Sequence, residues 1–323
     1  GSHPIEDAAG SLRQYLHDAY LLGTTYAFLV GDPNSANNST ADFTLMPYRY
    51  GCINDNPDLY DHWFSLPTTD WYFSDLTGDW NVDDDEFYGE RAGDAPSYNA
   101  DIIVGRLICT TTQDINNWVD KLLIYEKYPG NGNAGYVTKS LVTLADHCGS
   151  SPYWENLPDF SHTIMEEIPD CTSPNPTSPL GSSIISRLNN DKFGLWTWFN
   201  HGGTNTQHSC MLCMTANIDH NDGTLSKVWK VYSDSLCIDN GQDIQPDTYN
   251  SLDYMTNNNE PSIIYAVSCH VIPFDLTKSN SLSGSRNCGE SFTVGGRYGG
   301  VAFLGNTLDA FRTGYYLDFA TTL

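Results

Sequence analysis

The chain has 323 residues, a length that fits one large domain, and we expect a single enzyme-sized domain over residues 4–323. Its 15 Lys and Arg residues against 40 Asp and Glu residues give a formal charge of −25 at pH 7. This charge would repel phosphate backbones and anionic lipids, so nucleic acid is not an expected partner. No segment approaches the roughly 18 consecutive apolar residues that span a bilayer, so we expect no membrane insertion.

Residue usage indicates an exported protein. Nine cysteines accompany 20 tyrosines and 8 tryptophans, while Lys and Arg together number only 15. This composition predicts a protein that is secreted or displayed on the cell surface, where disulfides can form. Because nine is an odd number, at least one thiol is left over if the other cysteines pair.

Helices and short apolar strands alternate from the start of the chain. Residues 1–3 (GSH) resemble the remnant of a cleaved affinity tag and are set aside. Apolar residues at helical spacing predict a helix over residues 8–22, and an apolar strand follows over 24–32. A second strand is predicted at residues 100–106, and then a helix over 111–130 that ends at a Pro-Gly pair.

The same alternation continues through the second half of the chain. Strands are predicted at residues 139–146, 193–200, 261–269 and 299–307, and helices at residues 182–190 and 288–294. Apolar strands alternating with helices are typical of an α/β fold whose mostly parallel sheet is covered by helices on both faces. The pattern also allows two subdomains with a boundary near residues 130–138. Residues 204–259 are polar, and we interpret them as a long insertion between core strands.

Two of the predicted strands end at residues with catalytic chemistry. The aromatic run FGLWTWFN is followed by His201 and two glycines, and the run IIYAVS is followed by Cys269. Catalytic groups in open parallel sheets collect at the carboxyl ends of the strands. A nearby imidazole lowers the pKa of a thiol and later protonates the leaving amine. The backbone N–H of Gly202 could donate to a developing oxyanion, because no side chain stands in its way.

Structural interpretations of these residues remain open. His201 could be a buried histidine that its neighbours satisfy, and Cys269 could be an inert core thiol or half of a disulfide. His270 is a poor rival for the base, because successive side chains of a strand point to opposite faces. Asp146, at the end of the strand predicted over 139–146, could orient the imidazole, line a pocket for a basic substrate side chain, or cap a turn.

The order of these segments resembles the gingipain family (C25-type) of cysteine peptidases, which have a caspase-like fold of clan CD. The resemblance covers roughly residues 12–313 and includes the segments YLHDAYLLGTTYAFLVGD, DWYFSDLTGDW, ADIIVGRL, KLLIYEKYPG and NCGESFTVGGRYGGVAFLGNT. It implies a peptidase in which Cys269 attacks the scissile carbonyl and His201 shuttles the proton. The N–H groups of Gly202 and Cys269 would stabilise the tetrahedral oxyanion, and water would then hydrolyse the acyl-enzyme thioester.

We therefore expect a monomeric, secreted cysteine endopeptidase that acts on protein or peptide substrates. The acidic composition favours a basic residue before the scissile bond only weakly, because the charge of the whole chain does not fill a pocket. One alternative is a sortase-like transpeptidase with the same Cys-His pair, in which an amine replaces water as the acceptor. Another alternative is a non-catalytic binding module that calcium stabilises.

The acidic segment DWNVDDDEFYGE over residues 79–90 resembles a calcium-binding loop. Its oxygen-bearing residues follow the spacing of an EF-hand loop, with candidate ligands Asp79, Asn81, Asp83, Asp85 and Glu90. The sixth position, normally glycine, is Asp84, and no flanking helices are evident. We expect a structural calcium ion here, in line with the calcium dependence of gingipains, and a solvated acidic loop is the alternative.

A Cys-x-x-Cys motif lies in the polar insertion. Cys210 and Cys213 have His208 close before them and Cys237 beyond. A zinc or redox site remains open, but no second Cys-x-x-Cys motif supports it. We expect these cysteines to form disulfides that hold the insertion in place.

Overall fold

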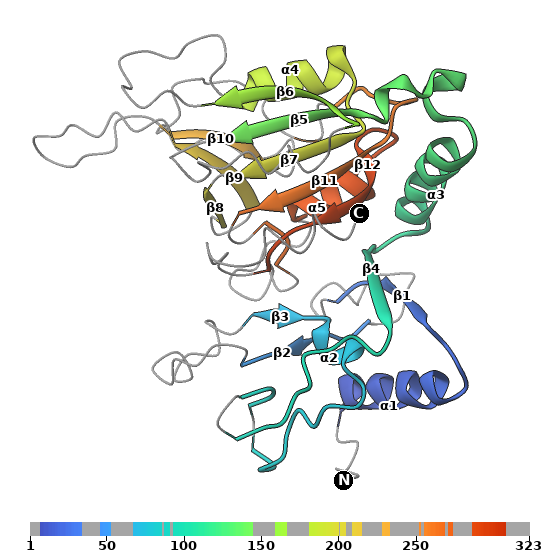
Figure 1. Cartoon of the computed structure of the whole chain (residues 1–323), viewed down its shortest axis with the longest axis vertical. Helices are drawn as coiled ribbons and strands as arrows, with labels where there is room; N and C mark the ends of the chain where they lie inside the picture. Colours follow the sequence, from blue (N-terminus) through green and yellow to red (C-terminus); the bar gives the residue numbers. More distant parts are fainter. Residues whose placement is uncertain are drawn as a thin grey trace, which may run out of the picture. The chain divides into compact units, whose positions relative to one another are not determined.

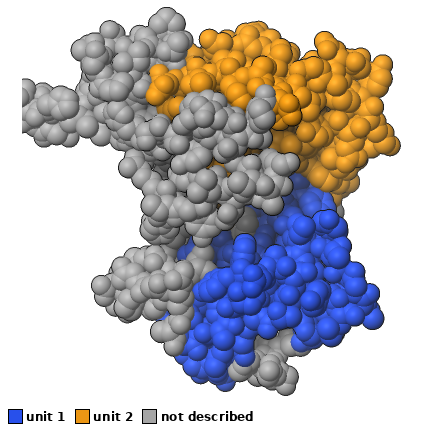
Figure 2. Space-filling view, in the orientation of Figure 1, with its two compact units in different colours: residues 1–111, 273–278 blue, residues 112–272, 279–323 orange. Residues whose placement is uncertain are grey.

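The computed structural model describes the chain in segments. These are residues 7–33, 46–52, 67–85, 87–90, 93–144, 159–166, 181–199, 201–204, 209–214, 228–232, 252, 255–268, 271–273 and 286–307. The chain divides into two compact units (Figure 2). Unit 1 contains Gly1–Thr111 and Pro273–Lys278, and unit 2 contains Thr112–Ile272 and Ser279–Leu323.

Unit 1 is built on a small parallel sheet (Figure 1). Its elements are α1 (Ala8–Leu21), β1 (Tyr26–Gly31), β2 (Arg49–Tyr50), β3 (Thr68–Thr69), α2 (Trp71–Ser74) and β4 (Ile103–Ile108). Strands β1 and β4 pair in parallel, and the short strands β2 and β3 pair antiparallel. The N-terminus of α1 is capped by Asp7, whose carboxylate accepts a hydrogen bond of 2.8 Å from the N–H of Gly10.

A fully buried carboxylate organises the loops of unit 1. Asp75 accepts hydrogen bonds from the N–H groups of Gly78, Ser97 and Tyr98, from the Ser97 hydroxyl and from the Trp80 indole. These bonds tie the segment after α2 to the segment that leads into β4. A buried carboxylate is stable only when such donors replace its lost hydration.

The guanidinium of Arg13 fixes the same segment from α1. Its nitrogen atoms donate to the carbonyl oxygens of Tyr72, Asp75 and Gly78 at distances of 2.7–2.9 Å. Helix α1 is therefore joined to α2 and the following loop by directional bonds in addition to the apolar cluster around Leu16 and Trp80.

Unit 2 contains a five-stranded parallel sheet. Its order is β12-β11-β7-β5-β6 (Figure 1). The strands are β5 (Lys139–Leu144), β6 (Ser161–Glu166), β7 (Leu195–Phe199), β11 (Ser262–Val267) and β12 (Gly300–Leu304), and all their pairings are parallel. The central strand β7 buries Trp196 and Trp198 completely. This sheet and the helices that flank it confirm the predicted α/β fold.

Three helices and two 3-10 turns belong to the described part of unit 2. These are α3 (Thr112–Lys127), η4 (Pro129–Gly132), η5 (Ala134–Tyr136), α4 (Gly181–Asp191) and α5 (Cys288–Thr293). Helix α4 contributes Ile184, Ile185 and Leu188 to the main core. Helix α5 starts with a capping box in which Asn287 and Glu290 exchange hydrogen bonds between side chain and backbone.

Helix α3 buries a lysine rather than its apolar residues. Lys121 is only 1% exposed, and its ammonium donates to the carbonyl oxygens of Phe292, Gly296 and Tyr298 at 2.8–3.3 Å. Leu123, an apolar residue of the same helix, is 43% exposed. Burial lowers the pKa of Lys121 to about 7.

These contacts explain where the two units divide. The indole of Trp118 donates to the carbonyl of Val301 at 3.0 Å, so α3 is bonded to β12 in the same way as Lys121 is bonded to the α5 region. The division into compact units comes before α3, at Thr111. The subdomain boundary near residues 130–138 stays a prediction.

The described residues of the segment over residues 204–259 include regular structure. Strands β8 (His201–Thr204), β9 (Ser209–Met214) and β10 (Val228–Tyr232) form an antiparallel sheet in the order β10-β9-β8. Leu252 and Met255 are buried in the main core of unit 2. The insertion predicted from the sequence thus contributes two strands and part of the core.

The buried lysine gives a stability prediction. An ordinary lysine has a pKa of 10.5, so between this value and about 7 the unfolded chain holds a proton that the folded chain does not. Folding is therefore increasingly favoured as the pH rises through this range. Relative to Lys121→Met, the wild-type free energy of unfolding should rise by roughly 1–3 kcal/mol between pH 7 and 9.5 in urea titrations.

Lys127→Met is the matched control, because Lys127 is an exposed residue in the last turn of the same helix. Its stability difference from wild type should stay constant over the same pH range. A constant difference for Lys121→Met as well would contradict the assignment of the pH effect to the buried amine.

Candidate active site and acidic loop

Three strands of the parallel sheet in unit 2 end at the same level. Leu144 of β5 is paired with Phe199 of β7, and Phe199 is paired with Val267 of β11. Each is the last residue of its strand. The three strands therefore deliver the following residues to one carboxyl edge, where parallel sheets place their ligands.

The residues predicted for the active site follow these strand ends at one common interval. Asp146, His201 and Cys269 are each the second residue after the end of their strand. The structure describes the backbone of His201 and Gly202 as the first two residues of β8. Asp146 and Cys269 lie outside the described residues, so the contact between Cys269 and His201 stays a prediction.

Apolar side chains beneath this edge pack into one small cluster. Val142, Leu144 and Phe199 are each at most 4% exposed, and Val267 packs against them. Side chains two positions apart on an extended strand share a face. The cluster therefore supports the carboxyl edge on the face that Leu144, Phe199 and Val267 have in common.

The chain around Cys269 and His270 is anchored on both sides by one residue, Asn306. The carbonyl of Ser268 accepts a hydrogen bond of 3.2 Å from the side-chain amide of Asn306. The N–H groups of Val271 and Ile272 donate to the backbone carbonyl of Asn306 at 3.1 and 3.2 Å. No motif in the sequence indicated this role, because Asn306 lies near the end of the last predicted strand, 299–307, without any catalytic pattern.

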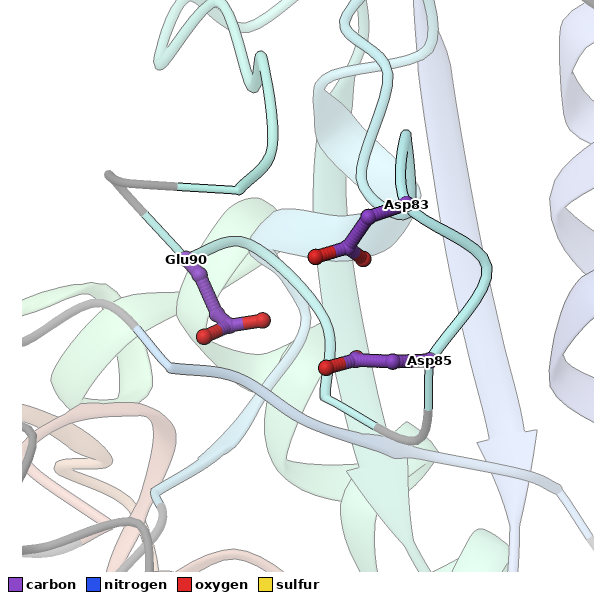
Figure 3. Close-up of side chains that lie close together, drawn as sticks. All are labelled: Asp83, Asp85 and Glu90. Atoms are coloured by element: carbon purple, nitrogen blue, oxygen red, sulfur yellow. The ribbon is translucent and has the colours of Figure 1, made fainter.

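The acidic loop brings together three of its five candidate ligands. Carboxylate oxygens of Asp83, Asp85 and Glu90 lie within 4.8 Å of one another (Figure 3). Asp79 lies outside this group; its carboxylate accepts from the N–H of Asn81, and its backbone pairs with Ala95.

The other candidate, Asn81, closes the loop on itself. Its side-chain amide accepts from the N–H of Asp85 and donates to the Asp85 carbonyl at 3.1 and 3.0 Å. Asp84, at the position that is glycine in an EF-hand, has a φ of +62°. Aspartate tolerates this left-handed conformation better than most residues, so the turn forms without glycine.

A further aspartate outside the predicted set holds the loop. The carboxylate of Asp94 accepts from the N–H groups of Val82, Gly89 and Glu90 at 2.6–3.1 Å. Spacing alone could not single out Asp94, because it lies beyond the twelve-residue pattern. It joins the two ends of the loop and leaves Asp83, Asp85 and Glu90 to face one another.

Glu90 is the member of this cluster whose surroundings disfavour its charged form. The pKa of Glu90 is raised by desolvation and then by the negative charges of Asp85, Asp83 and Asp94. Within the described residues, Glu90 Oε2 is buried and makes no hydrogen bond. Hard carboxylate oxygens in such a cluster suit a cation such as Ca²⁺, whose charge would balance the repulsion.

The cysteines give no structural support for disulfides in the described part of the chain. Cys52, Cys109 and Cys288 are buried as thiols. Cys210 and Cys213 are on β9, but only their backbone is described, and Cys237 and His208 lie outside the described residues. Disulfides in the insertion therefore stay a prediction.

The fold matches that of a known protease. A solved structure described as "Structure of Protease" superposes with a TM-score of 0.53 at 15% sequence identity. The match covers 97% of this chain and 54% of the protease, so the chain spans about half the length of that protein. At this identity the likeness shows the fold alone, a caspase-like α/β arrangement.

A family model narrows the class further. The model of peptidase family C25 matches residues 5–320. The chain therefore belongs to family C25, the gingipain family of cysteine peptidases, and the resemblance seen in its sequence is confirmed. No curated protein gives a significant match. Within the described ranges, no helix has the length and apolar character that crossing a membrane requires.

The acidic loop gives a second prediction, which concerns the cation-free protein. A carboxyl whose pKa is higher in the folded than in the unfolded chain destabilises the fold above that pKa, and the penalty disappears as the pH falls through it. In a chelator at pH 7, Glu90→Gln should therefore raise the melting temperature. This gain should shrink as the pH is lowered to 5.

Glu126→Gln makes the same chemical change at an exposed position of α3 and serves as the control. Calorimetry of both variants and wild type at the two pH values provides the comparison. If Glu90→Gln lowers the melting temperature at pH 7, repulsion among these carboxylates is not the dominant effect.

Proposed function

We propose that the chain is a cysteine endopeptidase in which Cys269 is the nucleophile and His201 is the general base. The observation that carries this proposal is the register of β7 with β11, in which Phe199 is paired with Val267. Both candidate residues are two positions beyond this pair. Membership of a cysteine peptidase family supports the same assignment.

The register makes a thiol–imidazole contact geometrically reasonable. Neighbouring strands are about 4.8 Å apart, so equivalent positions beyond a shared edge begin within reach of each other's side chains. Phe199 and Val267 pack in one cluster, so they are on the same face of the sheet. An interval of two residues preserves the face on an extended chain, which favours His201 and Cys269 on a common side.

The chemistry follows from this pair. The imidazole of His201 accepts the thiol proton, and the Cys269 thiolate attacks the scissile carbonyl to give a tetrahedral oxyanion. The N–H groups of Gly202 and Cys269 are the proposed donors to that oxyanion. The protonated imidazole then gives its proton to the leaving amine, and a thioester forms. Water, deprotonated by His201, hydrolyses the thioester and releases the thiolate.

Asp146 is proposed as the acidic residue of the same site. It has the same interval from the end of β5, and Leu144 is level with Phe199 in the sheet. A carboxylate at this edge would orient the His201 imidazole through its second nitrogen. The alternative use, in a pocket for a basic substrate side chain, is separated from this role by the kinetics below.

A calcium ion is proposed as a structural cofactor in the acidic loop. Asp83, Asp85 and Glu90 would hold it, with Asp79 and Asn81 supporting the loop through their hydrogen bonds. The raised pKa of Glu90 and its unpartnered oxygen support this proposal. Export from the cell remains a proposal that rests on composition, in particular on the nine cysteines and few basic residues.

The nucleophile and base are tested by single substitutions. Cys269→Ala should abolish cleavage of a peptide library, and His201→Ala should lower kcat/KM by at least about 100-fold, since general-base catalysis contributes that much or more. Ser140→Ala, a buried serine of β5 remote from the carboxyl edge, is the control for folding and should stay active. Cleavage retained by Cys269→Ala would overturn the choice of nucleophile.

Whether water or an amine accepts the acyl group from the enzyme is tested with the same library plus an added primary amine. Hydrolysis predicts free carboxyl termini as the main products, whereas a transpeptidase gives ligated peptides that mass spectrometry detects. An acyloxymethyl ketone peptide should label Cys269 in the presence of calcium and a reductant. No adduct under these conditions would favour a non-catalytic binding module.

Asp146→Asn separates the two roles of the acidic residue. If the carboxylate orients the imidazole, kcat should fall for substrates of every kind, by about 100-fold or more. If it lines a specificity pocket, KM should rise for substrates with a basic residue before the scissile bond and stay constant for others. Unchanged kinetics for all substrates would remove Asp146 from the site.

A further inference from the structure

The strongest unassigned feature of unit 2 is the set of bonds around Asn306. Its side-chain Nδ2 donates to the Ser268 carbonyl at 3.2 Å, and its own carbonyl accepts from Val271 and Ile272 at 3.1 and 3.2 Å. One residue from the chain after β12 thus contacts the segment after β11 at two points. Between those points are only Cys269 and His270.

The anchors on both sides of this dipeptide are themselves buried. Ser268 is 1% exposed, and Val271 is fully buried in the main core. The Val271 carbonyl accepts a hydrogen bond of 3.1 Å from the N–H of Cys288, which attaches it to the first turn of α5. The residues that flank the dipeptide on both sides are therefore held in place by the core.

The residue before Asn306 is a glycine, and its small size matters for this contact. A Cβ atom on Gly305 would come 2.8 Å from Val271 Cγ2, closer than side-chain atoms approach one another. Glycine at position 305 therefore permits the close approach that lets Asn306 reach both sides of the dipeptide. The carbonyl contacts of Asn306 are backbone bonds, whereas the Ser268 contact depends on its side-chain amide alone.

We propose that Asn306 is a positioning residue for the nucleophile, and that its side-chain amide sets the direction in which the Cys269 thiol and N–H leave the sheet. This proposal rests on the assignment of Cys269 as the nucleophile. Asn306 would act through the Ser268 carbonyl, which belongs to the peptide unit that also contains the Cys269 N–H. Rotating that carbonyl would rotate the proposed oxyanion donor with it.

The test compares Asn306, which is partly buried, with Asn257, a second asparagine of unit 2 whose side chain bonds to backbone groups. Asn257 is 3% exposed and forms side-chain bonds with the Glu260 carbonyl and with both backbone groups of Gly299, before the starts of β11 and β12. Asn306→Ala and Asn257→Ala should both lower the melting temperature. Only Asn306→Ala should lower kcat, by roughly 10–100-fold with little change in KM, because small misplacements of a nucleophile carry penalties of this size.

Asn306→Gln retains an amide donor and should recover part of the lost kcat. If the alanine variant does not fold, Asn306→Ser replaces it, since its hydroxyl is too short to reach the Ser268 carbonyl. Equal kcat losses in Asn257→Ala and Asn306→Ala, or none in Asn306→Ala, would overturn the proposal.

A second measurement keeps this result separate from the proposed function. Alkylation of Cys269 by iodoacetamide, followed as a function of pH by mass spectrometry, requires no peptidase activity. Wild type and Asn306→Ala should differ in rate and in pH midpoint, while Asn257→Ala should follow wild type. Identical profiles for all three proteins would exclude a positioning role, whether or not the wild type cleaves peptides.

Discussion

The parallel pairing of β7 with β11 is the constraint on which the rest of unit 2 depends. Hydrogen bonds in a parallel ladder fix the register, so Phe199 and Val267 end their strands side by side. The proposed pairing of His201 with Cys269 follows from that one alignment. A shift of one residue would move the apolar side chains of a strand to the opposite face and separate the positions that follow.

The surrounding structure protects this register. Trp196 and Trp198 of β7 are fully buried, and their rings meet edge to face at a centroid distance of 4.6 Å. The amino ends of β11 and β12 are held by Asn257, and their carboxyl ends by Asn306. The ammonium of buried Lys121 donates hydrogen bonds to three backbone carbonyl oxygens in and after α5, which attaches α3 to this region. Polar contacts thus hold the amino and carboxyl ends of these strands, while aromatic rings pack at the centre of the sheet.

The acidic side chains of unit 1 include two groups of carboxylates with different surroundings. Asp75 and Asp94 are surrounded by N–H and hydroxyl donors, and each closes a loop. Asp83, Asp85 and Glu90 face one another instead. Desolvation raises the pKa of Glu90, and the negative charges of its neighbours raise it further. Carboxylates that accept hydrogen bonds fix the loop, and the clustered carboxylates are the ones proposed to bind a cation.

The core helices and strands could be predicted from the sequence because their apolar runs are long and well separated. Strand β6 was missed, since Ser161–Glu166 has only two apolar residues, Ile164 and Met165, which form neither an apolar run nor an alternating pattern. The burial of Lys121 was missed because hydrophobic spacing cannot anticipate three carbonyls converging from residues 171–177 positions away. Asn306 carried no signal for the same reason: its partners are near β11 in space but 34–38 positions away in sequence.

The most direct test of the account is the pH dependence of Cys269 alkylation by iodoacetamide in wild type and in His201→Ala. If the register brings the pair together, the wild-type thiol should react below the pH range of an ordinary cysteine, whose pKa is about 8.5. The profile of His201→Ala should then move up toward that ordinary range. Identical profiles in the two proteins, both centred at the ordinary value, would contradict the central claim that β7 and β11 deliver a catalytic pair.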